Sequence, residues 1–290
     1  MNRCHVVSAL VIVALVAPVA LAAELPYRVA SKLPIGGEGG WDYLLADPAS
    51  QHLFVSRSTR VQVLDLATGK LVAEIPDTEG VHGIALAPEF GVGFTSNGRG
   101  NSVTVFDLKT LKPLATLEID GKNPDAILYE PVSKRVFTFN GGSANATAID
   151  ARNYAVAGTV ALPGKPEFAV ADGTGRVFVN IEDKAVLVGL DARTLKVEST
   201  WPLTGCEEPT GLALDARNAR LFAGCHNQVM TIVDAGSGKV VATVPIGAGV
   251  DATAFDPQTK LAFSSNGAGT VTVVREESPD KFTVLADVRT

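Results

Sequence analysis

Six residues that recur at intervals of about 42 residues, a length typical of repeat architectures, carry most of the side chains that could act together chemically. They are four carboxylates, a histidine and a threonine: Asp42, His82, Asp125, Glu167, Thr210 and Asp251. Carboxylates that meet around one opening repel each other, which raises their pKa values or recruits a cation such as Ca²⁺ or Mg²⁺. The alternative is that each acidic residue caps its own turn and that the opening is merely solvated.

The elements that would position these residues are copies of one hairpin, which is clearest at residues 94–107. Residues 94–96 read as a strand end, Asn97-Gly98 as a turn, and residues 102–107 as a strand with alternating polar and apolar positions. A phenylalanine occupies the same position of every copy: Phe54, Phe94, Phe137, Phe178, Phe222 and Phe263. The interval from each phenylalanine to the next is therefore nearly constant along the sequence. We expect these rings to pack between neighbouring copies.

The repeat length indicates the architecture. A period of about 42 residues with four strand-like runs predicts an all-β fold, a β-propeller in which each repeat forms one four-stranded antiparallel blade. We expect one propeller domain over residues 24–290, with six complete blades at about 41–80, 81–123, 124–165, 166–208, 209–249 and 250–290. In these blades the six recurrent residues begin the inner strands and face the central channel.

A second repeated position follows each phenylalanine by eleven to thirteen residues. It holds Asp65, Asp107, Asp150, Asp191 and Asp234, with Arg275 in the sixth copy. In the first and fifth copies a glycine follows near the end of the turn, as a type I turn followed by a left-handed residue requires. We therefore interpret this position as turn capping.

The strand ends at residues 94–97, 137–140, 177–180 and 263–266 are followed by β-branched strands and a D-x-x-T type of turn. This pattern resembles the YVTN-type β-propeller repeat of exported bacterial YncE-like proteins, over the whole chain after its first residues. The resemblance implies fold rather than activity. Arg57 and Cys225 stand where the motif has asparagine. Asn97, Asn140, Asn180 and Asn266 are expected to serve the turns, although they could hydrogen-bond a polar ligand.

The resemblance implies a seven-bladed ring, whereas the sequence supplies six complete repeats. Residues 27–34 match the outer strand at residues 240–245, and a sixth outer strand ends just before residue 290. We expect the seventh blade to be incomplete in this chain, with a gap beside the first blade and residues 27–33 poorly paired. The alternative is a closed ring of six blades.

The segment 1–23 predicts a secretory signal peptide. Arg3 precedes an apolar run from Val6 to Val19 and a small-residue pattern at residues 20–22. We therefore expect a periplasmic or secreted protein with no membrane span after cleavage. The formal net charge of −6 disfavours nucleic acid as a partner, since phosphate binding needs a cationic face.

Cys206 and Cys225 fall in loops on the same face of one predicted blade. In an exported protein they are expected to form a disulfide, which would contribute about 3 kcal/mol. One alternative is a metal site of both cysteines with His226 and Glu207 or Glu208, and another is two free buried thiols.

The sequence contains none of the motifs G-x-S-x-G, H-E-x-x-H, C-x-x-C or a phosphate-binding glycine loop. It therefore favours a monomeric binding or scaffold propeller that holds a protein, a peptide or a small polar ligand on its top face. This is the face where the loops between strands two and three lie together with the loops that join one blade to the next. No cofactor is predicted beyond Ca²⁺ or Mg²⁺ at the channel mouth. The ligand-binding candidates are Asp42, His82, Asp125, Glu167, Thr210, Asp251, Arg57, Asn97, Asn140 and Asn266.

The first alternative function is a metal-dependent enzyme of the lactonase or lyase type known among propellers. His82 would be its acid or base, and Asp42, Asp125, Glu167 and Asp251 would hold the metal. The second alternative is a nucleic-acid-binding propeller.

Overall fold

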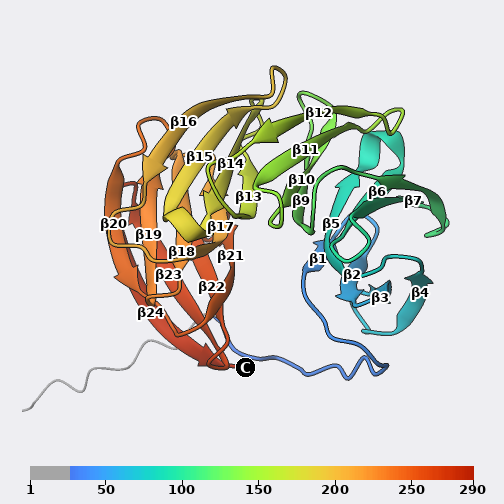
Figure 1. Cartoon of the computed structure of the whole chain (residues 1–290). Coiled ribbons are helices and arrows are strands. Elements are labelled where there is room, and N and C mark those ends of the chain that lie inside the picture. The colour runs from blue at the N-terminus through green and yellow to red at the C-terminus, as the bar shows by residue number, and fades with distance from the viewer. Residues whose placement is uncertain (1–26) are drawn as a thin grey trace, which may run out of the picture.

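The computed structural model describes residues 27–290, and the predicted signal peptide lies outside them. Twenty-four strands form six four-stranded sheets, and each strand pairs antiparallel with the next strand of its sheet (Figure 1). Helical structure in the described residues is confined to two short 3₁₀ turns, η1 (Pro88–Phe90) and η2 (Glu182–Lys184). No helix in residues 27–290 has the length and apolar character needed to cross a membrane. The predicted propeller of four-stranded blades is confirmed.

The blades follow one another along the chain. Blades one to three consist of β1 (Leu44–Asp47), β2 (His52–Arg57), β3 (Arg60–Asp65) and β4 (Leu71–Ile75); β5 (Val81–Ala87), β6 (Val92–Asn97), β7 (Ser102–Asp107) and β8 (Pro113–Glu118); and β9 (Pro124–Glu130), β10 (Arg135–Asn140), β11 (Asn145–Asp150) and β12 (Val156–Ala161). Blades four to six consist of β13 (Pro166–Ala171), β14 (Arg176–Ile181), β15 (Val186–Asp191) and β16 (Lys196–Pro202); β17 (Pro209–Asp215), β18 (Arg220–Cys225), β19 (Val229–Asp234) and β20 (Val240–Pro245); and β21 (Val250–Asp256), β22 (Leu261–Asn266), β23 (Thr270–Ser278) and β24 (Lys281–Arg289).

The repeated aspartate caps the turn between the third and fourth strands. Asp107 Oδ1 accepts hydrogen bonds from the Lys109 and Thr110 amides at 3.1 and 2.6 Å, and from the Thr110 hydroxyl at 2.8 Å. These donors favour the charged form and lower the pKa of Asp107. In the first blade Gly69 supplies the left-handed residue of this turn, with φ of 66°.

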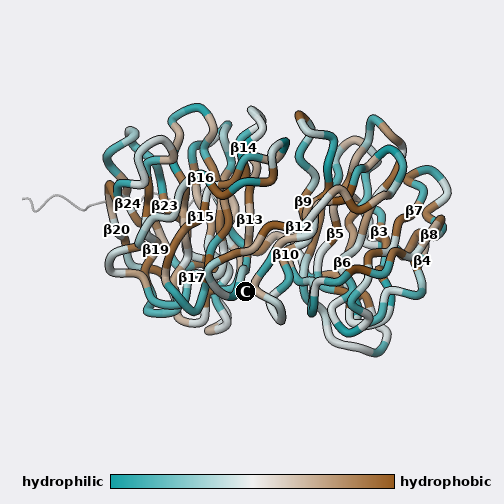
Figure 2. The backbone as a smooth tube through the Cα atoms, turned by 45° about the horizontal axis from the view of Figure 1, so that its top comes forward, coloured by the Kyte–Doolittle hydropathy of each residue, from teal (hydrophilic) through white to brown (hydrophobic). Residues whose placement is uncertain are grey.

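The repeated phenylalanine packs each blade against the next one. Phe54 of the first blade lies 5.9 Å from Phe106 of the second, and Phe222 of the fifth lies 5.1 Å from Phe255 of the sixth, between ring centroids. In the first five blades this side chain is almost completely buried. Figure 2 shows that apolar residues concentrate along the strands and polar residues in the loops at both ends of the blades. The core therefore consists of successive layers between blades.

The six blades do not close into a ring. Each innermost strand packs against that of the next blade, from β1 through β5, β9, β13 and β17 to β21, but within the described residues β21 has no comparable packing against β1. Leu44 on β1 is 60% exposed, whereas Ile84 and Leu212 at the matching positions of the second and fifth blades are 6% and 1% exposed. The expected gap beside the first blade is present (Figure 1).

Residues 27–40 cross this opening without forming a strand. Tyr27 covers the sixth phenylalanine, Phe263, in an edge-to-face contact with a centroid distance of 4.9 Å. Leu33 lies against Gly69 in the first blade. The segment therefore bridges the sixth and first blades without pairing to either, as the sequence predicted (Figure 1).

The open ring predicts unequal effects of two matched substitutions. Phe94→Ala should lower the free energy of unfolding by about 3–5 kcal/mol, because a buried ring is lost and a cavity is left between two blades. Phe263→Ala should cost clearly less, because Phe263 is only half-buried beneath Tyr27. Denaturant unfolding of both variants measures the difference. Equal losses would show that the sixth blade is as well covered as the second.

Candidate functional site

The recurrent channel residues lie at or just before the start of the innermost strands. Asp42 precedes β1, and the other five lie near the beginnings of β5, β9, β13, β17 and β21. Burial of its phenol raises the pKa of Tyr43 well above its usual value, and the charges of all four channel carboxylates add to this shift. Each of the four channel carboxylates therefore lies near enough to Tyr43 to act on its phenol.

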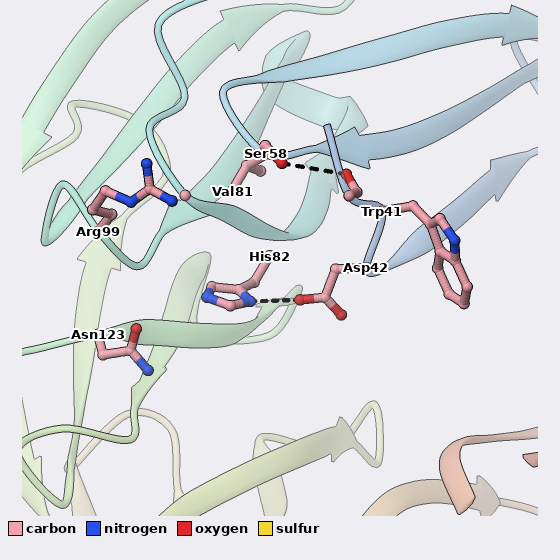
Figure 3. A pocket seen from close by; sticks show the side chains of 9 residues that line it. Trp41, Asp42, Ser58, Val81, His82, Arg99 and Asn123 are labelled. Atoms are coloured by element: carbon pink, nitrogen blue, oxygen red, sulfur yellow. Dashed lines mark hydrogen bonds and ion pairs between the residues drawn. The ribbon is translucent and has the colours of Figure 1, made fainter. Parts of the chain in front are cut away.

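Three of these residues form a cluster, with His82 between two aspartates. His82 Nδ1 lies 2.5 Å from Asp42 Oδ2 (Figure 3). It lies 3.8 Å from Asp125 Oδ1. One ligand atom from each of the three residues lies within 4.8 Å of the others, which is close enough for a single metal ion. The hydrogen bond to Asp42 raises the pKa of His82, with a further contribution from the charge of Asp125, whereas burial opposes the shift. Burial raises the pKa of Asp125.

Serine hydroxyls of the second strands hold the backbone at or beside all three members of this cluster. Ser56 Oγ accepts a hydrogen bond from the Asp42 amide at 3.1 Å. Ser96 Oγ accepts one from the Gly83 amide at 2.9 Å and donates to the Asp125 carbonyl in the next blade. The sequence shows these serines one position before Arg57 and Asn97, but their role depends on contacts that only the fold creates.

Glu167 belongs to the same mouth but is engaged by a cation of the protein. Lys165 Nζ lies 2.6 Å from Glu167 Oε1 and also contacts Glu182. Burial, together with the charge of Asp125, raises the pKa of Glu167 to about 7 despite the opposing effect of Lys165. Lys165 was not identified from the sequence, although it lies only two residues before the recurrent position.

Thr210 and Asp251 complete the set of recurrent residues and differ in availability. Thr210 is buried, and its hydroxyl donates to the Val250 carbonyl of the next blade at 3.0 Å, so it joins two blades. Asp251 is more exposed than Thr210, but its carboxylate is still partly buried. This burial and the charge of Asp42 raise the pKa of Asp251. Asp42 lines one pocket together with His82 and another together with Asp251.

All four asparagine positions are buried, and three of them bond within their own hairpins, whereas Asn180 donates to the Thr210 and Gly211 carbonyls of the next blade at 3.1 Å. Asn97 donates to Ser102 Oγ and Thr104 Oγ1 at 3.2 and 2.9 Å, and Asn140 and Asn266 make the equivalent bonds in their own blades. These amides are committed to joining the second and third strands. The side-chain amides of Asn97, Asn140 and Asn266 are therefore engaged within their own hairpins.

Arg57 is also buried and serves the segment that precedes the first blade. Its guanidinium donates to the carbonyls of Gly36, Gly37 and Glu38 at 3.2, 2.8 and 3.2 Å. It thereby anchors the glycine-rich stretch that leads to Trp41 and Asp42. Its contribution to the site is to position that stretch.

The two cysteines of the fifth blade form the predicted disulfide, Cys206–Cys225. Both sulfurs are used in this bond, so the alternative metal site and the alternative of two free thiols are excluded. His226 instead pairs with Glu208, with 2.9 Å between Nδ1 and Oε2.

A pocket of about 430 Å³ opens beside the cluster (Figure 3). Trp41, Arg99 and Asn123 line it together with Asp42 and His82. Gly98 lies so close to His82 that a Cβ there would be 2.6 Å from Nε2, which explains why the turn needs a glycine. The repeat pattern could not identify Trp41, Arg99 and Asn123, since they do not recur in the other copies.

An aromatic pair lies across the channel. Tyr43 of the first blade and Phe168 of the fourth blade stack with a centroid distance of 5.2 Å. Tyr43 follows Asp42 and Phe168 follows Glu167, so each aromatic ring adjoins one of the channel carboxylates. The channel mouth therefore combines carboxylates with an apolar surface.

The raised pKa of Glu167 predicts a pH-dependent stability. The pKa is about 7 in the folded protein and about 4.3 in an unfolded chain, so stability is lost as pH rises through this range. Glu167→Gln should raise the free energy of unfolding by roughly 1–3 kcal/mol at pH 8 and leave it almost unchanged at pH 4. Denaturant unfolding at both pH values measures this effect.

Asp107→Asn is a control for which we expect the opposite effect on stability. Hydrogen bonds lower the pKa of Asp107, so this substitution should destabilise the protein at pH 8, with a smaller cost as pH falls through that pKa. A Glu167→Gln variant that is less stable than the wild type at pH 8 would contradict the electrostatic account of the channel mouth.

Comparison with known proteins identifies the fold. No protein-family model matches the chain, and no curated protein matches it significantly in sequence. Among solved structures it is similar to U3-55K, with a TM-score of 0.77 and 9% identity over 88% of this chain and 83% of that one. It is also similar to the WD40 repeats of RRP9, with a TM-score of 0.78 and 9% identity over 88% and 82% of the two chains. At this identity the likeness shows that the chain shares the β-propeller fold with WD40-repeat proteins.

Proposed function

We propose that this chain is an exported β-propeller binding protein whose site is the acidic mouth of its central channel on the top face. The observation that carries the proposal is the convergence of Asp42, His82 and Asp125 from three blades, with ligand atoms within 4.8 Å of one another. Four carboxylates share this mouth, so a cation or a cationic group of a partner would relieve their repulsion. The ligand is therefore expected to be positively charged.

Export and family form part of the same proposal. A disulfide on the top face is typical of proteins that fold in an oxidising compartment, and the first residues read as a signal peptide. The repeats resemble those of YncE-like proteins of the YVTN type. We propose a periplasmic or secreted protein of this kind.

The simplest cationic ligand is a divalent metal ion. Carboxylate oxygens from Asp42 and Asp125 suit Ca²⁺ or Mg²⁺, and the imidazole of His82 extends the choice to Mn²⁺ or Zn²⁺. A proton on His82 competes with such an ion, because the pKa of His82 is raised by the same carboxylates. Metal affinity should therefore increase as the pH rises through the pKa of His82.

A metal-dependent enzyme of the lactonase or lyase type is the second candidate. It is favoured by the hydrogen bond between Asp42 and His82, since a carboxylate that orients an imidazole is a common feature of acid–base catalysts. The pocket beside His82 has room for a small substrate and is lined by Arg99, whose charge is partly balanced by Glu79 at 3.7 Å. Turnover of a lactone panel that is lost in His82→Gln would support this function over binding alone.

Calorimetric titration with Ca²⁺, Mg²⁺, Mn²⁺ and Zn²⁺ at pH 8 tests the binding proposal. We expect one ion to bind, and Asp42→Asn or Asp125→Asn to weaken its binding by at least about tenfold, because each removes a charged ligand. Repeating the titration at pH 6 should give weaker binding.

Asp191→Asn provides a matched control, because Asp191 is an aspartate that caps a turn through the amides of Arg193 and Thr194. It should bind the ion as the wild type does. Absence of binding for all four ions would refute a metal site, and equal weakening by Asp191→Asn would assign the loss to stability rather than to ligation.

A further inference from the structure

The opening between the first and sixth blades contains a cavity of about 660 Å³. It is lined by residues of the first blade, including Trp41 and Leu44, and by residues of β21 and β22 in the sixth blade. These faces are exposed because no blade lies between them, as the exposure of Leu44 shows. The volume lies within the range of about 300–1,000 Å³ that is typical of small-molecule sites.

The walls of this cavity are largely apolar. Trp41, Tyr43 and Phe168 contribute aromatic rings, and Val250, Ala252 and Val271 contribute aliphatic side chains. Trp41 is 70% exposed, which is unusual for an indole that also lines a cavity. Such a surface favours a ligand with an apolar body.

The charge of the cavity is negative. Asp42 and Asp251 line it, and the one other ionisable side chain in the lining outside Tyr43 is His226, which is paired with Glu208. Glu208 therefore balances any positive charge on His226. Two carboxylates beside aromatic rings are the features that recognise an ammonium group, through charge attraction and cation–π contact. The two carboxylates would repel an anion. A purely apolar ligand would remove water from both carboxylates without replacing the hydrogen bonds that they lose.

We propose that this cavity binds an organic cation, an amine with an aromatic or aliphatic body, with its ammonium group between Asp42 and Asp251 and its body against Trp41. The inference rests on the proposed function, because Asp42 lines both this cavity and the pocket beside His82. It extends that function by naming the class of ligand and the apolar cavity walls that would hold the body of that ligand. An inorganic ion would use the carboxylates alone and would leave the apolar walls without a role.

Trp41 fluorescence provides a direct test. The chain has two tryptophans, and Trp201 packs on Phe178 in the fourth blade, so Trp201→Phe leaves Trp41 as the sole tryptophan reporter. In this background 2-phenylethylamine should change the emission with a dissociation constant of about 1 mM or lower. The neutral analogue 2-phenylethanol should bind at least about tenfold more weakly, a factor that corresponds to about 1.4 kcal/mol.

Two variants assign the site. Asp251→Asn should weaken binding of the amine by about tenfold and leave the alcohol unchanged, because only the amine uses the carboxylate. Ala252→Phe should weaken both ligands by filling the cavity. Glu118→Gln, at an exposed position of the outer strand β8, is the control and should change neither.

The inference is overturned if amine and alcohol bind equally, if neither binds, or if Asp251→Asn has no effect. It is also overturned if Trp41 emission changes with protein concentration and sedimentation shows a dimer, since a second copy would then occupy the opening. Metal titration separates this result from the proposed function, because Asp125 does not line the cavity. Loss of amine binding with retained metal binding refutes the inference alone, whereas loss of both refutes the acidic mouth as a cation site.

Discussion

Packing of one aromatic side chain per repeat against the next blade is the interaction on which the arrangement depends. Phe54, Phe94, Phe137, Phe178 and Phe222 each fill the layer between two blades, and this layering places the starts of successive inner strands around one channel. Where the layering stops, at Phe263 and Leu44, the same apolar faces become exposed. One packing rule therefore produces both the channel mouth and the cavity at its open side.

The channel mouth concentrates like charge at a cost to stability. Burial raises the pKa values of Asp125, Glu167 and Asp251, so each of these carboxylates is harder to ionise in the folded protein than in an unfolded chain. His82 and Lys165 offset part of the repulsion, since each contacts the carboxylates directly. Keeping these carboxylates together, where apolar side chains could be buried instead, therefore costs the protein stability. Strong perturbation of this kind is a feature of functional sites.

The sequence allowed the blades to be predicted because their signals are local and repeated. The spacing of the phenylalanines, the aspartates of the turns and the β-branched strands each identify an element without knowledge of the others. The same alignment brought Asp42, His82 and Asp125 together, and it predicted the pairing of Cys206 with Cys225. Contacts made by single residues without repeated counterparts could not be predicted. Examples are the stack of Tyr43 on Phe168, the engagement of Glu167 by Lys165 and the anchoring of Gly37 by Arg57.

The central claim is that cations and protons compete for one acidic mouth, and proton release on cation binding tests it most directly. Calorimetry at pH 7 in two buffers of different ionisation heat gives the number of protons exchanged per cation bound. The raised pKa values of His82 and Glu167 predict a net release of protons, because a bound cation favours the ionised carboxylates and the neutral imidazole. Cation binding that releases no protons, or that takes them up, would contradict the claim.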